Sequence, residues 1–241
     1  MIDWRLELND ALPSTSDAVI ARAEAGEPAG LAVLAHSQTK GRGSRGRHWN
    51  SPSGNCYLSV LLRPGGRLTQ AGIWPLVASL AVADALRPLL PDPSRLSLKW
   101  PNDVLLGGNK ICGILLDLAA DPDGGLRWLV IGCGINLATA PALADRSAAC
   151  LRDEGVDSPP PEDFARSLLA ALGHRHDRPP AEVQAAWLAR AHPIGTNLYV
   201  RYAGQDLAGT FAGLSPDGHL LLRTDAGPRT ISSGDVLLSP S

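Results

Sequence analysis

Residues 38–50, QTKGRGSRGRHWN, hold the highest density of side chains suited to binding an anion. Three glycines alternate there with four basic residues, Lys40, Arg42, Arg45 and Arg47. Glycine lets backbone N–H groups turn toward a ligand, and guanidinium groups match phosphate or carboxylate oxygens two at a time. No Asp or Glu lies between Glu27 and Asp84, although the formal net charge of the whole chain is only -2. This segment, the Gly/Arg loop, is therefore predicted to bind an anion, and because its charges are alike we do not expect it to pack on itself without one.

The alternative for this loop is a solvated basic segment or a Gly/Arg nucleic-acid tract. A nucleic-acid-binding module would spread basic residues over one face, whereas here they are confined to one loop of a slightly acidic chain. A non-enzymatic anion- or RNA-binding module therefore stays open as a reading from a different functional class.

A second stretch suited to chemistry is residues 99–103, KWPND, with KICG at residues 110–113. It sets an amide, a carboxylate and an ammonium group on neighbouring strand ends. Asp103 could orient a ligand or bind Mg²⁺ carried by a nucleotide, because magnesium commonly takes one or two protein oxygens together with phosphates. Lys110 could neutralise charge on a phosphoryl or carboxyl oxygen. A simple Pro-Asn-Asp turn and an exposed lysine are the structural alternatives.

The third stretch is residues 131–137, IGCGINL, an apolar strand in which two glycines allow close approach to the backbone. Asn136 could then hydrogen-bond a base edge, or it could only form a turn. Ser14, Thr15 and Ser16 precede a helical pattern, where hydroxyl side chains are frequent as helix caps.

The elements that position these stretches predict an α+β fold with a mixed, mostly antiparallel sheet and helices. Strand-like runs cover residues 2–8, 31–36, 56–62, 96–100, 104–106, 110–118 and 127–137. Helical patterns cover residues 18–26 and 69–90, and two further helices begin at the proline clusters 159–161 and 179–180. After residue 192 the character changes to short alternating runs separated by Gly, Asp and Pro, so we expect a first domain over 1–192 and a small barrel over 193–241.

Composition indicates a soluble globular protein, with 44% hydrophobic and 19% charged residues in 241. No signal peptide is apparent, and the longest apolar run, near residues 73–90, is interrupted by Pro75, Asp84 and Pro88. We therefore expect no membrane span and a cytoplasmic location. The four cysteines have no metal-ligand spacing and are predicted to be inert core thiols.

Taken in order, these blocks resemble the biotin protein ligase family. The resemblance rests on STS at residues 14–16, QTKGRG at 38–43, RGR at 45–47, Trp49, KWPND at 99–103, KICGIL at 110–115 and GCGIN at 132–136. It extends to the C-terminal runs, where Gly234, Asp235 and Val236 look like part of the small SH3-like domain of that family. The resemblance implies a class II synthetase-like catalytic domain followed by that SH3-like β-barrel.

What the resemblance implies is a two-step reaction. Biotin and Mg-ATP give biotinyl-5′-adenylate and pyrophosphate, and a lysine of a biotin carboxyl carrier protein then attacks the mixed anhydride. Biotin or its activated carboxyl would contact Ser14, Thr15, Ser16, Gln38, Arg42, Gly43, Ser44, Lys110 and Gly113. ATP would contact Arg45, Arg47, Trp49, Asn102, Asp103 and Asn136, with Asp103 also near the nucleotide-bound magnesium. Arg42 and Lys110 would be the catalytic residues, because bringing a carboxylate to a triphosphate requires positive charge where the two meet.

The chain departs from the family pattern in two respects. Ser44 stands where many relatives have a third arginine, so the hold on the adenylate is expected to be weaker or to depend on Arg45. The sequence begins almost at the catalytic blocks, so we expect a monofunctional ligase that does not bind DNA. A homodimer stays open. The main alternative is a lipoate-protein ligase, which has a similar fold and chemistry. The KWPND and GRGSRGR blocks favour the biotin ligases over it.

Overall fold

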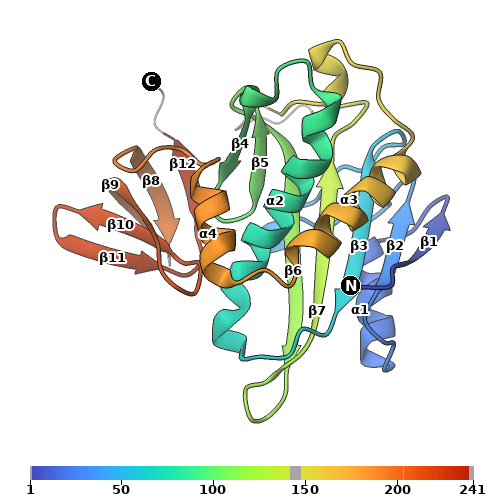
Figure 1. Ribbon diagram of the computed structural model, residues 1–241, viewed down its shortest axis with the longest axis horizontal. Coiled ribbons are helices and arrows are strands. Elements are labelled where there is room, and N and C mark those ends of the chain that lie inside the picture. The colour runs from blue at the N-terminus through green and yellow to red at the C-terminus, as the bar shows by residue number, and fades with distance from the viewer. Residues whose placement is uncertain (1, 142–147, 203, 239–241) are drawn as a thin grey trace.

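A seven-stranded sheet forms the centre of the computed structural model, which describes residues 2–141, 148–202 and 204–238 (Figure 1). The strand order is β1–β2–β3–β7–β6–β5–β4. β1 and β2 are parallel, and all other neighbouring pairs are antiparallel. The strands are β1 (Arg5–Asn9), β2 (Leu31–Ala35), β3 (Cys56–Leu62), β4 (Leu96–Lys99), β5 (Asp103–Leu106), β6 (Asn109–Ala120) and β7 (Leu126–Ile135).

Helices cover both faces of this sheet. On one face α2 (Trp74–Leu86) and α3 (Pro161–Arg175) pack on the strands, with α4 (Pro180–Leu188) beside α2; α1 (Thr15–Glu24) packs on the other face (Figure 1). Side chains of β3 alternate between the two cores: Leu58 and Val60 join the core under α2 and α3, and Leu61 joins the core under α1. A strand buried on both faces explains why β3 is an unbroken apolar run except for Ser59.

The expected α+β fold with a mostly antiparallel sheet is confirmed. One helix is shorter than its pattern predicted: only Trp74–Leu86 is α-helical, with 3₁₀ turns at Leu68–Ile73 and Arg87–Leu89. Pro75 lies in the first turn of α2 and Pro88 in the following 3₁₀ turn, where proline interrupts α-helical hydrogen bonding. By length and composition alone, the helical stretch Leu68–Leu89 could cross a membrane. Because 61% of that window is buried within the described structure, a core helix accounts for it.

A separate five-stranded antiparallel sheet follows, in the order β11–β10–β9–β8–β12. Its strands are β8 (Asn197–Tyr202), β9 (Gln205–Leu214), β10 (Leu220–Thr224), β11 (Gly227–Ile231) and β12 (Asp235–Leu238). Two side chains near β4 link it to the first sheet: the Trp100 indole N–H donates to the Gly218 carbonyl at 3.0 Å, and Lys99 Nζ donates to the Val236 carbonyl at 3.2 Å. The second sheet is thereby held next to the KWPND turn. The boundary after residue 192 and the SH3-like barrel stay predictions.

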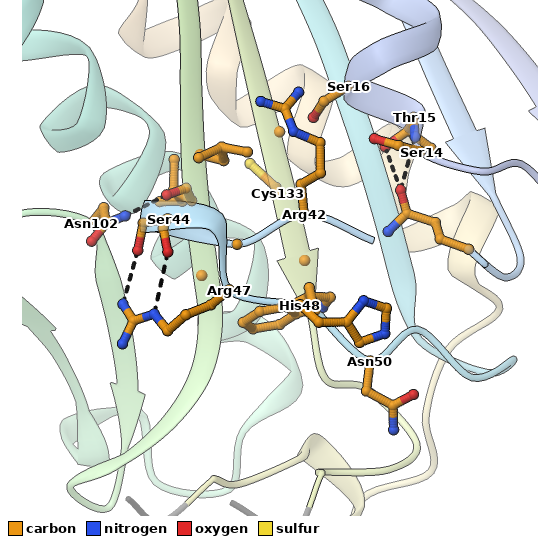
Figure 2. Close-up of a pocket in the computed structure, with 18 of the residues that line it drawn as sticks. Ser14, Thr15, Ser16, Arg42, Ser44, Arg47, His48, Asn50, Asn102 and Cys133 are labelled. Carbon is orange, nitrogen blue, oxygen red and sulfur yellow. Dashed lines mark hydrogen bonds between the residues drawn. The ribbon is translucent and has the colours of Figure 1, made fainter. Parts of the chain in front are cut away.

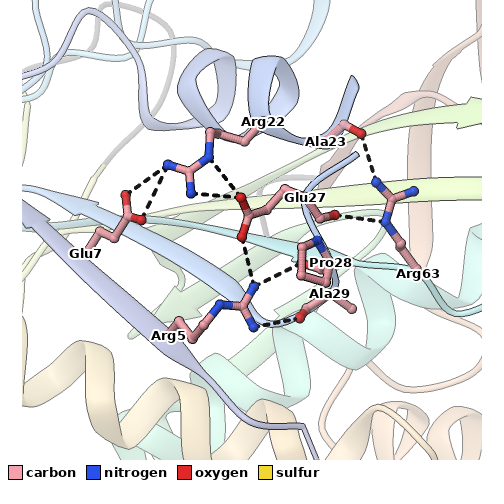
Figure 3. A network of polar contacts seen from close by, with 8 residues as sticks. All are labelled: Arg5, Glu7, Arg22, Ala23, Glu27, Pro28, Ala29 and Arg63. Carbon is pink, nitrogen blue, oxygen red and sulfur yellow. Dashed lines mark hydrogen bonds and ion pairs between the residues drawn. The ribbon is translucent and has the colours of Figure 1, made fainter. Parts of the chain in front are cut away.

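A polar network fixes the C-terminal end of α1 (Figure 3). Glu27 accepts from Arg22 at 2.8 Å and from Arg5 of β1 at 3.2 Å. Arg63, just after β3, donates to the carbonyls of Ala23 and Glu27. Individual surface ion pairs contribute little to stability, but a network that joins α1, β1 and the end of β3 restricts how α1 can move. The opposite end of α1 is therefore held in place above the sheet, and that end carries Ser14, Thr15 and Ser16.

Candidate functional site

A cavity of about 570 Å³ opens between the first turn of α1, the Gly/Arg loop and the strands β6 and β7 (Figure 2). Its size is within the range that holds a small-molecule substrate. The lining residues are Ser14, Thr15, Ser16, Gln38, Arg42, Gly43, Ser44, Arg47, His48, Trp49, Asn50, Ser59, Asn102, Lys110, Gly113, Ile114, Leu115, Gly132, Cys133, Gly134, Asn136, Pro141 and Ala148. Thirteen of the fifteen predicted site residues therefore meet here, all except Arg45 and Asp103.

One end of the cavity is a cluster of hydroxyl and amide groups. Ser14 caps α1 by accepting from the Asp17 backbone N–H at 3.2 Å. Thr15 Oγ1 donates to Gln38 Oε1 at 3.1 Å and shares a 2.8 Å hydrogen bond with Ser59 Oγ. Ser59 is also 3.1 Å from Ser16 Oγ. Hydroxyl groups both donate and accept, so this end can match a ligand head that carries both N–H and C=O groups.

The floor of the cavity is built from glycines, as the GCGIN block predicted. A Cβ at Gly134 would lie 2.6 Å from Trp49 Nε1, and one at Gly113 would lie 2.9 Å from Trp49 Cζ3. The Trp49 indole is therefore seated on two adjacent strands where only glycine leaves room. A Cβ at Gly132 would similarly meet Ser16 Oγ at 2.5 Å. These close approaches explain why both positions of the β7 motif, Gly132 and Gly134, require a residue without a Cβ.

Lys110 is held by a buried acid rather than exposed to solvent. Asp103, 5% exposed, pairs with Lys99 at 2.9 Å and with Lys110 at a shorter distance. Burial by itself raises the pKa of Asp103, but the neighbouring ammonium groups of Lys110 and Lys99 outweigh burial and bring its pKa below the ordinary value. Lys110 Nζ also lies 5.5 Å from the centre of the Trp49 ring, within cation–π range. The arrangement presents one oriented cation to the cavity.

The Gly/Arg loop forms a short hairpin. Trp49 N–H donates to the Gly41 carbonyl at 2.9 Å, and Gly43 N–H donates to the Arg47 carbonyl at 2.8 Å. The hairpin turns at Arg45 and Gly46, both in the left-handed region with φ of 61° and 71°. Glycine adopts that conformation freely, whereas arginine adopts it only at some cost.

The charges of this hairpin are met by three aspartates from other parts of the chain. Arg42 pairs with Asp17 and Asp117, each at 2.7 Å. Arg45 and Arg47 both pair with Asp235 of β12, Arg47 at 3.3 Å and Arg45 more closely. The loop thus packs against the protein's own carboxylates, and its dependence on a bound anion stays a prediction.

Some predicted site residues lie outside the cavity lining, and others already make hydrogen bonds or ion pairs within the protein. Arg45 faces Asp235 and lies outside the cavity lining, and so does Asp103. The carboxylate of Asp103 is shared by two lysines, an arrangement that disfavours the predicted contact with nucleotide or metal. No group of three or more His, Cys, Asp or Glu suited to a metal ion occurs in the part of the chain that is described. Asn102 donates to the Ile114 carbonyl and Asn136 to the Ala149 carbonyl, so each amide NH₂ has a backbone partner.

Sequence reasoning missed several residues of the lining. Ser59 is the clearest, and its signal was a single polar residue within the apolar run CYLSVLL. His48 and Asn50 flank Trp49 and also line the cavity, but neither their residue types nor their spacing set them apart in the sequence. Cys133 also lines the cavity, but burial raises the pKa of its thiol to about 12, so it stays protonated at neutral pH. That protonation agrees with the prediction of an inert cysteine.

Comparison with known proteins now decides the family. Residues 11–136 match the biotin/lipoate A/B protein ligase family, and residues 195–239 match the biotin protein ligase C-terminal domain. A biotin–[acetyl-CoA-carboxylase] ligase of Paracoccus denitrificans is 37% identical, with 85% of this chain and 88% of the relative covered. The chain belongs to the biotin protein ligase family. The resemblance seen in its motifs is thereby confirmed.

Two further relatives extend the match over nearly the whole chain. A biotin–[acetyl-CoA-carboxylase] ligase of Mycobacterium tuberculosis is 36% identical, covering 97% of this chain and 89% of the relative. The biotin protein ligase of Aquifex aeolicus, solved in complex with biotin and ATP, superposes with a TM-score of 0.78 at 28% identity, covering 98% of this chain and 99% of the other. The likeness therefore includes both sheets and their arrangement.

The ion pairs between the loop and β12 generate a testable prediction. Asp235→Ala removes the carboxylate shared by Arg45 and Arg47, so the tip of the hairpin loses its tie to the second sheet. We expect trypsin to cleave after Arg45 or Arg47 at least roughly five-fold faster, while the melting temperature changes by no more than a few degrees.

Asp206→Ala is the matched control, because Asp206 pairs with Arg201 at 2.9 Å and with no arginine of the loop among the residues described. Cleavage sites are read by mass spectrometry over a time course. Equal cleavage rates of the loop in wild type and Asp235→Ala would show that Asp235 does not restrain it.

Proposed function

We propose that this protein is an ATP-dependent ligase that activates biotin as biotinyl-5′-AMP and transfers the biotinyl group to a lysine of a biotin carboxyl carrier protein. The observation that carries the proposal is one cavity with a hydroxyl cluster at one end and the cations Lys110 and Arg42 lining it as well. Biotin has the matching composition, because its ureido ring carries N–H and C=O groups and its chain ends in a carboxylate.

The hydroxyl cluster suits the ureido ring. Thr15, Ser16 and Ser59 can exchange hydrogen bonds among themselves for bonds to the ligand without leaving a buried group unpaired. The rest of the lining includes Ile114, Leu115 and the backbone at Gly132, which suit an aliphatic chain. These features support a pose in which the ureido ring lies at the hydroxyl cluster and the carboxylate points toward Lys110.

At the cationic part, positive charge allows the biotin carboxylate to approach the α-phosphorus of ATP. A carboxylate oxygen forms the new bond to phosphorus as the bond to pyrophosphate breaks. Lys110 is held by Asp103 and aimed at the cavity, so its ammonium can stabilise the charge that develops on the oxygens. In the second step the neutral amine of the carrier lysine attacks the biotinyl carbonyl, AMP leaves with the bonding electrons, and the amide nitrogen loses one proton to solvent.

The nucleotide contacts that the family resemblance implied stay proposals. Arg47, Trp49, Asn102 and Asn136 line the cavity with the other site residues. Magnesium would arrive as the counterion of ATP, where it offsets phosphate charge. Asp103 does not fit as its ligand, because both carboxylate oxygens face ammonium groups. No step is therefore assigned to a metal held by the protein.

The carrier is proposed because the Paracoccus and Mycobacterium relatives are named for acetyl-CoA carboxylase, whose biotin is borne by such a carrier. A cytoplasmic location is proposed with it, because ATP and carboxylase carriers are found there. A homodimer, the absence of DNA binding and the monofunctional type all stay predictions.

The experiment that tests the proposed function compares ligands and then follows transfer. Biotin should raise the melting temperature and lipoate should not, since a ligand stabilises only the state that binds it. With ATP present, a purified biotin carrier domain should gain the mass of one biotinyl group. Stabilisation by lipoate together with lipoylation of a lipoyl domain would assign the chain to the other branch of the family.

The position of Lys110 leads to a sharp prediction. Lys110→Ala should reduce the rate of biotinyl-adenylate formation by roughly 10²-fold or more, because the oriented cation is lost at the reacting oxygens. The fold should persist, with a melting temperature within a few degrees, because Lys99 still pairs with Asp103.

Adenylate is measured by chromatography of quenched single-turnover reactions. Arg127→Ala, on an exposed position of β7 outside the cavity lining, serves as the control and should keep the wild-type rate. A wild-type rate in Lys110→Ala would remove Lys110 from the chemistry.

The glycine floor supports a prediction about Trp49. Gly134→Ala places a methyl group where the indole lies, so Trp49 must move and the proposed adenine contact is lost. We expect ATP affinity, measured by calorimetry in the presence of biotin, to fall by at least roughly ten-fold.

Gly173→Ala, in α3, is the matched control, because the added Cβ would lie 3.5 Å from Trp4 Nε1, an ordinary van der Waals distance. That change should leave ATP affinity unaltered and slightly stabilise the helix. Unchanged ATP affinity in Gly134→Ala would mean that the seat of Trp49 is unimportant for the nucleotide.

A further inference from the structure

Three segments far apart in the sequence meet at the guanidinium group of Arg42. Arg42 comes from the Gly/Arg loop, Asp17 from the first turn of α1 and Asp117 from the middle of β6. Nη1 of Arg42 donates to Asp17 Oδ1 and Nη2 donates to Asp117 Oδ1, each at 2.7 Å. Figure 2 shows the Arg42 side chain extending from the loop toward Ser16 at the start of α1. The loop is thus tied to both sides of the cavity by one side chain.

The two carboxylates are not equivalent. The side chain of Asp117 is 21% exposed, and its second oxygen, Oδ2, is buried with no hydrogen-bond partner in the described structure. The side chain of Asp17 is 55% exposed and lies where water can solvate it. The hydrogen bond to Asp117 is also the main reason that the pKa of Arg42 lies above its ordinary value. Breaking the pair with Asp117 would leave a poorly solvated charge, whereas Asp17 can exchange Arg42 for water at little cost.

Arg42 is therefore a cation facing the cavity whose donors are already partly occupied. A guanidinium carries five N–H donors in a planar fork that binds a carboxylate or phosphate best through two of them. A substrate anion that approaches from the cavity gains a second donor if one of the two aspartates gives way. Because Asp17 is the more exposed of the two, we expect the anion to displace Asp17 from Arg42 while Asp117 stays paired with it.

We propose that Asp117 is a positioning residue that holds Arg42 toward the cavity, and that Asp17 is an exchangeable partner which an anionic group of the substrate displaces. The proposal rests on the proposed function for the identity of that anion, the biotin carboxylate or the phosphate of its adenylate. It gives opposite roles to two acids that make contacts of equal length with the same arginine.

The test uses Asp17→Asn and Asp117→Asn in the full chain, since both changes remove charge and preserve shape. Asp117→Asn should lower kcat for adenylate formation by roughly ten-fold or more and raise the KM for biotin, because Arg42 loses its anchor. Asp17→Asn should leave kcat unchanged and lower the KM for biotin by roughly two- to five-fold, because the competing carboxylate is gone. Asp117→Glu should restore part of kcat.

A double variant separates exchange from a general charge effect. Arg42→Lys keeps the positive charge but loses the planar guanidinium fork that binds Asp17 and Asp117 through separate nitrogens, so adding Asp17→Asn to it should no longer lower the KM. This comparison stands even where Asp117→Asn folds poorly. A gain from Asp17→Asn that persists beside Arg42→Lys would overturn the exchange.

Two outcomes would overturn the assignment of roles: wild-type kinetics in a folded Asp117→Asn protein, or equal losses in both single variants. Wild-type protein assayed in parallel separates failure of the proposed function from failure of the roles given to Asp17 and Asp117. If wild type forms no adenylate from biotin, the proposed function fails; if wild type is active and the variants behave alike, only the roles of Asp17 and Asp117 fail.

Discussion

The site depends on the ion pairs that the buried carboxylate of Asp103 makes with Lys99 and Lys110. The carboxylate lies between the ammonium groups of Lys99 and Lys110, and a buried acid without those partners would be strongly disfavoured. Lys110 is thereby fixed at the cavity. Lys99 also donates to the Val236 carbonyl of β12, so the same acid lies between the proposed reaction centre and the second sheet. One polar cluster connects the substrate cavity to the C-terminal domain.

A second constraint is the like charge of the Gly/Arg loop. Without a substrate anion, Arg42, Arg45 and Arg47 are paired by aspartates from α1, β6 and β12. These acids tie the hairpin to α1, β6 and β12, and an anionic ligand would compete with them for the same guanidinium groups. If the proposed displacement of Asp17 holds, the substrate anion binds to a loop that is already shaped, so part of the ordering entropy has been lost before the ligand arrives.

Most of the fold and the site could be predicted from the sequence, for identifiable physical reasons. Strand alternation and proline positions marked the elements, and the glycine spacing of GRGSRGR and GCGIN marked the loop and the floor. Pairings between distant residues could not be predicted, because charge pairing carries no sequence spacing. The pairing of Arg45 with Asp235, 190 residues away, is the clearest example. The predicted nucleotide contacts of Arg45 and Asp103 stay predictions. Ser59 was hidden because one hydroxyl in an apolar strand has many structural explanations.

If this cavity joins the biotin carboxylate to the α-phosphate of ATP, exchange of labelled pyrophosphate into ATP measures that reversible step without any carrier. We expect exchange that requires biotin, saturates with it and stops when biotin is omitted. Exchange that proceeds equally without biotin, or no exchange by a folded protein supplied with biotin, ATP and magnesium, would contradict it.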